Sequence, residues 1–325
     1  MSDRITITNP LPAALEHYAV AFEETLGRIG ISPQRRPSRP VEGLRGRRGR
    51  IAMLRNAFLN VKGSRDGRDP NVQLWSSLGL LEPRLWSGKH SKNIVVIHDP
   101  IPLRRQTGHD EISRILAQRS PSRRIPATVL VHSQDAREEI CRILPNWEVV
   151  AAPLPIRTNL RTPPVERGRT VLVAGQYKPE RRLDLLRDLG PMLAERGIRG
   201  LVLGRGWPGD ILGWEVTNRF VQEQELDEAI GAASVVLIPY ARYYQSDIAV
   251  RAIEAGTPFI SPDTSFAIET LGQGSPLVVD RSASAMTYLL AIEEALSRAN
   301  AKRLFREYRS HVDSTWKSVF SSFFA

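Results

Sequence analysis

The chain has 325 residues, of which 42% are hydrophobic and 25% charged, and its formal net charge is +10 at pH 7. This length and apolar content are typical of a globular protein with two domains and exclude a disordered or fibrous chain. Its single cysteine, Cys141, cannot form an internal disulfide, and no apolar run approaches the roughly 18 residues that cross a bilayer. The first ten residues alternate like a strand rather than forming the continuous apolar block of a secretion signal. We therefore expect a cytoplasmic protein whose membrane contact is at most peripheral.

The first half of the chain alternates predicted strands and helices. Strands are predicted over residues 4–8, 31–36, 71–79, 93–98, 128–132 and 147–151, and helices over 12–30, 109–118 and 133–143. This order is typical of a parallel α/β domain, which we place at residues 1–156. The stretch 157–169 is rich in proline and charge and has no periodicity, so it is predicted to be the linker between the domains.

Much of the excess positive charge lies in one segment of this first domain. Arg47, Arg48 and Arg50 stand among apolar residues of the stretch 45–62. A basic amphipathic helix of this kind is typical of a surface that contacts anionic lipid or nucleic acid. The segment lacks the interleaved aromatic residues of a stacking platform, which makes nucleic acid the less favoured partner. The alternative is a solvated helix with an ordinary core face.

Polar residues follow two of the predicted strands of the first domain. Asn9 and Pro10 end the first strand, where we expect them to shape the floor of a cleft on the acceptor side of the protein. His98 and Asp99 leave the carboxyl end of strand 93–98, the edge at which open α/β sheets bind ligands. A histidine there can position or transfer a proton, and the alternative is a structural residue held by hydrogen bonds.

The second half repeats the α/β alternation over residues 170–299. Strands are predicted over 170–174, 200–204, a segment ending near 220–221, 234–239, 259–260 and 276–280, and helices over 183–196, 225–233, the segment between Ser246 and Gly256, and 284–299. A closing helix over 300–325 carries an apolar stripe. We expect it to pack back across both domains.

Two loops of the second domain are candidate parts of one anion site. Gly175 lets the backbone turn closely after the strand 170–174, and Lys178, Arg181 and Arg182 follow it, so three cations are available for a polyanion. Ser246 is predicted to cap the next helix, whose N-terminal amide groups and dipole favour a diphosphate. The alternatives are a solvated basic turn and a purely structural cap.

Three segments in this region resemble the retaining family-4 (group 1) glycosyltransferases. The loop G-Q-Y-K-P-E-R-R-L-D-L-L is similar to the family pattern G-R-x-x-x-E-K-G-x-D-x-L, with Gln176 at the usual arginine and Arg181 at the usual lysine. The segments R-F-V-Q-E-Q-E-L-D-E-A-I-G-A-A-S-V-V-L-I-P-Y and R-A-I-E-A-G-T-P-F-I extend the resemblance over residues 170–282. In the first half, H-D-P is similar to the H-E-P of members that glycosylate lipid carriers.

The resemblance implies the GT-B fold, in which two Rossmann-like α/β domains face each other across a cleft. It implies transfer of a sugar from a nucleotide-diphosphate-sugar donor to an acceptor, a lipid-linked or polysaccharide precursor, with retention of configuration. The donor is then a co-substrate, and no metal or other cofactor is expected, because Lys178, Arg181 and the end of the Ser246 helix supply the positive charge at the diphosphate.

The resemblance also assigns site residues. Those expected to contact the donor are Gly175, Gln176, Arg205, Val221, Tyr243, Gln245, Ser246, Asp247 and Arg251. Lys178 and Arg181 are expected to stabilise the leaving group, while His98 and Asp99 face the sugar and the acceptor. The family usually has two glutamates in an E-x7-E pattern, and here Tyr243 and Arg251 occupy those positions. This departure keeps open an alternative: a non-catalytic GT-B-like protein whose basic face binds anionic membrane or nucleic acid.

Overall fold

The structure is a computed structural model of the chain. It describes residues 4–10, 15–37, 51–52, 55, 59, 70–77, 93–103, 127–145, 147–159, 168–297 and 301–324. The predicted membrane residues Arg47, Arg48 and Arg50 and the predicted helix 109–118 lie outside these ranges. Within them, no helix is both long and apolar enough to span a membrane.

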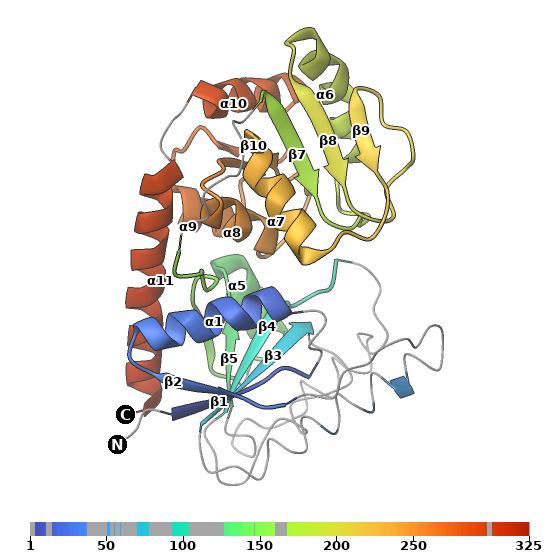
Figure 1. Cartoon of the computed structure of the whole chain (residues 1–325). Coiled ribbons are helices and arrows are strands. Elements are labelled where there is room, and N and C mark those ends of the chain that lie inside the picture. The colour runs from blue at the N-terminus through green and yellow to red at the C-terminus, as the bar shows by residue number, and fades with distance from the viewer. Residues whose placement is uncertain are drawn as a thin grey trace. The chain divides into compact units, whose positions relative to one another are not determined.

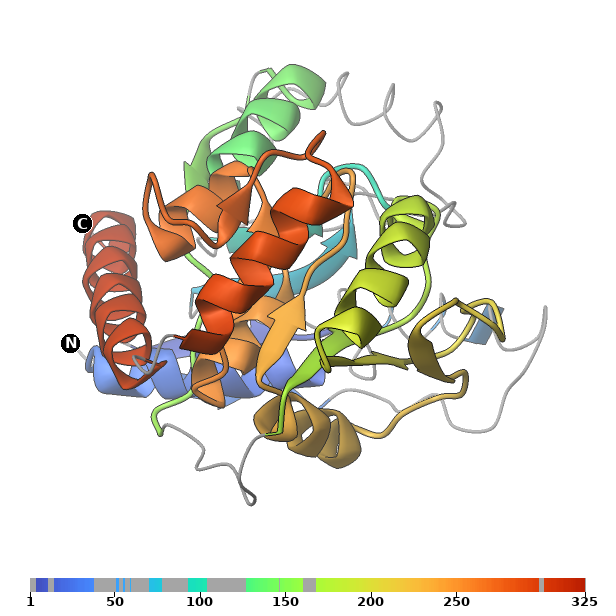
Figure 2. The same cartoon turned by 90° about the horizontal axis from the view of Figure 1, so that it is seen from above.

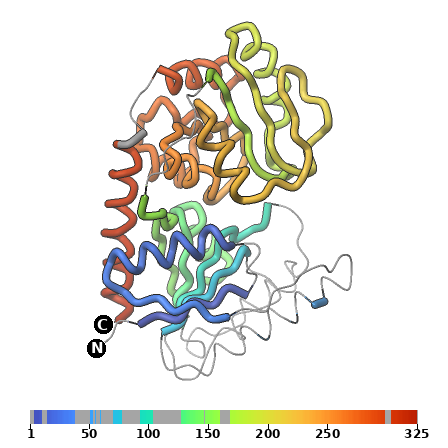
Figure 3. Tube along the Cα trace, viewed as in Figure 1, coloured from blue at the N-terminus to red at the C-terminus, as the bar shows by residue number. Residues whose placement is uncertain are grey.

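The chain forms two compact units, each built on its own parallel sheet of six strands. Unit 1 comprises residues Met1–Thr158 and His311–Ala325, and unit 2 comprises Asn159–Ser310. Figure 3 traces unit 1 mainly in blue and green and unit 2 from yellow-green to orange-red.

Unit 1 has the strand order β2-β1-β3-β4-β5-β6. Its elements are β1 (Arg4–Thr8), α1 (Glu16–Arg28), β2 (Ser32–Arg35), β3 (Asn71–Ser77), β4 (Asn93–Asp99), β5 (Ala127–Val131), α5 (Gln134–Ile143), β6 (Val149–Ala151) and the end of α11 (Ala301–Phe324). Nearly every residue of β3 and β4 is buried, as expected where helices cover both faces of a parallel sheet. The six predicted strands of this half are confirmed, with ends shifted by a few residues.

The C-terminal part of α11 packs against α1 within unit 1 (Figure 1). Trp316 is fully buried, its ring lies 5.0 Å from that of Phe22, and its indole N–H donates to the carbonyl of Pro153 at 3.0 Å. An ion pair of 2.8 Å between Arg28 of α1 and Asp313 of α11 also joins the two helices. The apolar stripe read in the sequence therefore covers α1, while residues 301–310 of the same helix group with unit 2.

Unit 2 has the strand order β12-β11-β10-β7-β8-β9. Its elements are β7 (Thr170–Ala174), α6 (Leu183–Glu195), β8 (Arg199–Leu203), β9 (Trp214–Thr217), α7 (Glu223–Ala232), β10 (Val235–Leu237), α8 (Asp247–Glu254), β11 (Phe259–Pro262), α9 (Ser265–Leu271), β12 (Val278–Val279) and α10 (Ala285–Ser297). The strand predicted to end near 220–221 ends instead at Thr217, and α9 was not predicted.

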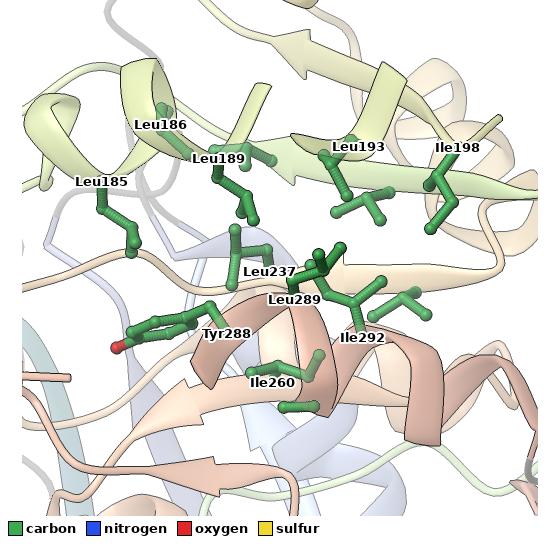
Figure 4. Close-up of a cluster of buried hydrophobic side chains, with 14 of the residues drawn as sticks. Leu185, Leu186, Leu189, Leu193, Ile198, Leu237, Ile260, Tyr288, Leu289 and Ile292 are labelled. Carbon is green, nitrogen blue, oxygen red and sulfur yellow. The ribbon is translucent and has the colours of Figure 1, made fainter. Parts of the chain in front are cut away.

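One face of this sheet is covered by α6 and α10, which lie side by side in Figure 2. Figure 4 shows apolar side chains of both helices beside strand residues: Leu186 and Leu189 of α6 and Ile292 of α10 are buried with Leu237 and Ile260 of the sheet. Burial of each such side chain contributes roughly 1.5–3 kcal/mol. This core fixes the strands whose ends carry the site.

Both sheets reverse their strand order at one point. In unit 2 the chain moves outward from β7 through β8 to β9, then returns to β10 on the other side of β7 and moves outward through β11 to β12. The loops after β7 and β10 therefore diverge from a common point. Ligands of open α/β sheets bind at the carboxyl ends of the strands at such a switch point.

Candidate functional site

Two glycines form the floor of the switch point in unit 2. Gly175 follows β7 with φ +96°, and Gly204 follows β8 with φ +149°, conformations that other residues rarely adopt. A Cβ atom at position 204 would lie 2.2 Å from the carbonyl oxygen of Gly175. The amide of Gly175 also donates to the carbonyl of Leu203 at 2.8 Å, so the backbone at the ends of β7 and β8 is in direct contact.

Hydrogen bonds join the loops that leave three neighbouring strands. We call them the β7 loop (residues 175–182), the β8 loop (204–213) and the β10 loop (238–246). Tyr177 N donates to Arg205 O at 3.0 Å, which joins the β7 and β8 loops. Arg182 N donates to Pro239 O at 2.7 Å, and Ala241 N donates to the carbonyl of residue 180 at 2.8 Å, which join the β7 and β10 loops. The three loops thus form one structure.

Arg181 lies inside this structure, with only 5% of its surface exposed. Its Nε donates to the Tyr240 hydroxyl at 2.9 Å and its Nη2 to the carbonyl of Ala174 at 2.6 Å. The guanidinium carbon lies 4.9 Å from the ring centre of Trp207 and 4.6 Å from that of Tyr240. Such cation–π contacts gain strength where water is excluded.

The neighbouring cations have other surroundings. Lys178 is half-buried in the β7 loop. Arg182 donates to the carbonyls of Arg281 at 2.9 Å and Ala283 at 3.3 Å, and it pairs with Asp184 at 3.0 Å. The donors of Arg182 are therefore used at the start of α10 and α6. Arg181 and Arg182, although adjacent in the sequence motif, therefore make separate sets of contacts.

Arg205 and Gln176 lie together at the outer side of the site. Arg205 Nη2 donates to Gln176 Oε1 at 3.3 Å, and its guanidinium lies 6.0 Å from the ring of Phe220, which is 67% exposed. Phe220 leads into Val221 just before α7. Phe220 is not among the predicted site residues, although the matched segment R-F-V-Q-E-Q-E-L contains it.

The N-terminus of α8 lies beside the β7 loop. The Ser246 hydroxyl accepts from Ala249 N at 3.2 Å, so the predicted cap is confirmed. A Cβ atom at position 175 would lie 4.0 Å from Ile248 in the first turn of α8. Gln245 precedes the cap, and its buried Oε1 has no hydrogen-bond partner among the described residues. Tyr243 is buried and its hydroxyl bonds to that of Ser261.

Arg251 is buried beneath the first turns of α7 and α8. It pairs with Asp247 at 2.6 Å, with Asp227 at 2.8 Å, and with Glu223. Burial alone would lower the pKa of Arg251, but the three carboxylates outweigh burial and raise the pKa above its usual value. The arginine that stands at a family glutamate position therefore joins two helices through acidic side chains.

In unit 1, the predicted residues gather at the carboxyl edge of the sheet. Asn9 and Pro10 follow β1, whereas His98 and Asp99 end β4, and β3 lies between those strands. His98 is 4% exposed, its Nδ1 lies 2.9 Å from the carbonyl of Trp75, and its ring packs edge-on against Tyr18 at 4.4 Å.

A second buried histidine follows the adjacent strand. His132 comes directly after β5, and its ring lies 5.3 Å from that of His98. Its Nδ1 contacts the carbonyl of Ala152 at 3.0 Å. Burial, together with the nearby His98, lowers the pKa of His132 from 6.5 to about 3, although the Ala152 contact opposes the shift. His132 is not among the predicted site residues, although it ends a predicted strand just as His98 does.

Comparisons with known proteins give fold-level likeness only. No protein-family model matches the chain, and neither does any curated protein. Among solved structures, the chain is similar to an E. coli trehalose-6-phosphate structure bound with UDP-2-fluoro glucose, with a TM-score of 0.64, 10% identity and 98% of each chain covered. It is also similar to sucrose-phosphate synthase from Thermosynechococcus elongatus, with a TM-score of 0.60, 14% identity, and 97% of this chain and 96% of that chain covered.

A GtfA/B complex matches with a TM-score of 0.53 and 10% identity over 83% of this chain. The chain spans 60% of the length of that matched chain. These likenesses show that the chain has the GT-B fold of two Rossmann-like α/β units. They are consistent with the sequence resemblance to family-4 glycosyltransferases.

Proposed function

We propose that this GT-B protein is a glycosyltransferase that moves a sugar from a nucleotide-diphosphate-sugar donor to an acceptor. The observation that carries the proposal is the junction of three strand-end loops at the switch point of unit 2, directly beside the capped N-terminus of α8. That arrangement provides an anion site with an exposed aromatic ring at its outer side. A uridine nucleotide is the first donor to test, because one structural neighbour is described as bound with UDP-2-fluoro glucose.

The diphosphate is assigned to the β7 loop and the N-terminus of α8. Lys178 and Gln176 come from the loop. The backbone amide groups of the first turn of α8, which follows Ser246, add the positive end of the helix dipole. As the bond between sugar and phosphate breaks, negative charge grows on the leaving diphosphate. Groups already in place stabilise that charge without reorganisation, so we propose that the transfer is metal-independent.

The nucleoside and the sugar are assigned to either side of the diphosphate. The exposed ring of Phe220, with Arg205 near its face, suits a stacked base, and backbone groups near Val221 can contact the edge of the base. The buried Gln245 Oε1 is an acceptor, so it suits a sugar hydroxyl. Tyr243 and Asp247 lie in the same segment and complete the proposed donor contacts. Arg251 is proposed to contribute indirectly, by holding Asp247 in place through their ion pair.

The acceptor side is assigned to the carboxyl edge of unit 1. His98 and Asp99, with Asn9 and Pro10, are the predicted residues there. We propose that His98 orients or transfers a proton during the reaction and that the acceptor is a lipid-linked or polysaccharide precursor. Retention of configuration is part of the same proposal and rests on the sequence resemblance.

The first test is binding of UDP and UDP-glucose to the full chain by thermal shift and calorimetry, since a ligand of the folded state raises the melting temperature. Lys178→Ala should weaken UDP binding by about tenfold to a hundredfold, because it removes a charge-assisted hydrogen bond to phosphate. Lys317→Ala, on an exposed part of α11, is the matched control and should bind as the wild type does. Equal UDP affinity in all three proteins would contradict the proposed diphosphate site.

The second candidate is a GT-B-like binding protein without transfer activity. Arg251 favours it, because this arginine replaces a family glutamate and is occupied by three carboxylates. Turnover separates the two candidates: acceptor-dependent release of UDP supports the transferase, and UDP binding without release supports the binding protein. Contact of Arg47, Arg48 and Arg50 with anionic membrane stays a prediction under either candidate.

A further inference from the structure

We propose that Arg181 is a positioning residue that holds the three loops of the site together instead of binding the diphosphate itself. The inference deepens the proposed function, because it says how the donor site is kept in shape. Its structural part does not depend on the identity of the ligand. It concerns Arg181, Tyr240 and Trp207, which come from three different loops.

Two of the hydrogen-bond donors of Arg181 are directed at protein groups. Nε reaches the Tyr240 hydroxyl and Nη2 reaches the carbonyl of Ala174, both within normal hydrogen-bond distance. A guanidinium has five N–H donors in a rigid plane, so two acceptors in fixed places set its orientation. At 5% exposure the side chain is part of the interior of unit 2 and not of its surface.

The guanidinium lies near two aromatic rings from different loops. Trp207 belongs to the β8 loop and Tyr240 to the β10 loop, while Arg181 itself belongs to the β7 loop. One side chain therefore contacts all three loops. In addition, the Trp207 indole N–H donates to Gly175 O at 2.9 Å, which brings the same ring onto the floor of the site.

The contacts continue from Trp207 toward Phe220. Asn218 Nδ2 donates to Trp207 O at 2.6 Å, and Gly206 N donates to Asn218 Oδ1 at 2.8 Å. Asn218 stands two residues before Phe220, whose ring is proposed to stack on the base. Arg181 is thus connected on one side to the proposed base site and on the other, through Tyr240, to the segment that leads to Ser246.

The substitution Arg181→Lys distinguishes positioning from direct binding. Lysine is the usual family residue at this position and keeps the positive charge, so a direct contact with phosphate would survive the change. A lysine ammonium has no planar group to place near the two rings and cannot hold two acceptors at the angles of the guanidinium fork. If Arg181 positions the loops, Arg181→Lys must loosen them.

The first experiment is amide hydrogen exchange of the ligand-free full chain. We expect exchange in the β7, β8 and β10 loops to become about tenfold faster in Arg181→Lys, with exchange in β3 and β4 of unit 1 unchanged. Arg199→Lys, an identical change in an exposed ion pair with Glu215, is the control and should leave the loops as they are. Unchanged exchange in the three loops of Arg181→Lys would overturn the proposal.

The second experiment compares the affinities of UDP and uridine by calorimetry. Loosened loops weaken the binding of UDP and of uridine by the same factor, so Arg181→Lys should keep the wild-type ratio of UDP affinity to uridine affinity. Lys178→Ala should lower this ratio, because it weakens mainly the binding of the diphosphate. Arg181→Lys with undiminished affinity for UDP would show that its charge alone suffices and would contradict positioning. Should the wild type fail to bind UDP, the proposed donor is wrong, and the exchange experiment still decides the role of Arg181.

A milder variant covers the case in which Arg181→Lys does not fold. Tyr240→Phe removes only the hydroxyl that accepts from Arg181 Nε and keeps the ring. It should accelerate exchange in the β7 and β10 loops by a smaller factor than Arg181→Lys, with the β8 loop less affected, because the contact with Trp207 remains. Exchange identical to that of the wild type in Tyr240→Phe would count against the proposal.

Discussion

At the scale of single residues, His132 shows how burial sets a charge state. The ring is 1% exposed and is surrounded by Tyr18, His98 and Trp316. In these surroundings a positive charge would be poorly solvated, and the pKa of His132 falls to about 3. His132 is therefore neutral in the folded protein at neutral pH, which lets it pack as an aromatic ring at the end of β5.

This burial predicts a pH dependence of stability. Below pH 6.5 the unfolded chain takes up a proton at His132, but the folded chain does not until about pH 3, so the stabilisation is complete above pH 6.5 and is lost as the pH falls toward 3. Between pH 7.5 and pH 5 this group should account for a loss of about 2 kcal/mol in the free energy of unfolding. Urea denaturation of the wild type and of His132→Gln at both pH values measures the difference.

The control for this prediction is His311→Gln, because His311 is exposed on α11. It should lose as much stability on acidification as the wild type, whereas His132→Gln should lose about 2 kcal/mol less. A pH dependence in His132→Gln equal to that of the wild type would show that His132 does not carry the effect.

Residue-scale prediction from the sequence worked where the cause is local. Ser246 caps α8 because its hydroxyl accepts from the backbone amide of Ala249, three residues later, so the local sequence pattern was enough to predict the cap. The surroundings of Arg181 could not be predicted in this way. Its partners Trp207 and Tyr240 lie far along the chain and are brought near only when the loops of β7, β8 and β10 meet.

At the scale of elements, Arg251 joins α7 to α8. Its guanidinium is almost fully buried, and its three acidic partners come from the first turns of both helices and from Asp227 in the middle of α7. Such a group stabilises the pairing of the helices while all its members are present. Removal of the arginine leaves carboxylates close together without a counter-charge.

Arg251→Met should therefore lower the free energy of unfolding by roughly 3 kcal/mol, the size expected when one partner of a buried ion pair is removed. Arg199→Met is the matched control, since the Arg199–Glu215 pair is exposed and should contribute much less to stability. Denaturant unfolding of both variants measures the two costs. Similar losses in the two variants would mean that the buried group adds nothing to the joining of α7 and α8.

Elements were predictable from hydrophobic runs and turn residues, and the exceptions have physical reasons. The continuous apolar runs 94–97 and 171–174 form the buried parts of two parallel strands, β4 and β7, as predicted. Helix α9 (Ser265–Leu271) has only seven residues, too few for a periodic pattern to stand out, although Thr264 caps it. Strand β9 ends at Thr217 because Asn218 then turns its side chain to the β8 loop, which alternation alone does not reveal.

At the scale of the whole molecule, α11 is one helix with residues in both compact units. Residues 301–310 belong to unit 2, where Phe305 and Tyr308 are buried, and residues 311–324 belong to unit 1, where Trp316 is buried. The two sheets have separate cores, so a change in the unit 1 part of α11 should act first on unit 1.

Trp316→Ala tests this division. Removal of the fully buried indole should cost unit 1 about 3–5 kcal/mol, because it opens a cavity beside Phe22 and deletes the hydrogen bond to Pro153. Amide exchange should accelerate in β3 and β4 and leave β7 and β8 near their wild-type rates. Leu290→Ala, at an exposed position of α10, is the control and should change neither unit. Equal acceleration in both units would contradict separate cores.

The backbone contact between Gly175 and Gly204 has a consequence for protein engineering. Since a methyl group at position 204 would overlap a main-chain carbonyl, libraries aimed at a new donor should leave both glycines constant. Diversity is better placed at Arg205, Phe220 and Gln245, the proposed donor contacts that take no part in this glycine contact. Donor choice can then be redesigned while the strand exits keep their geometry.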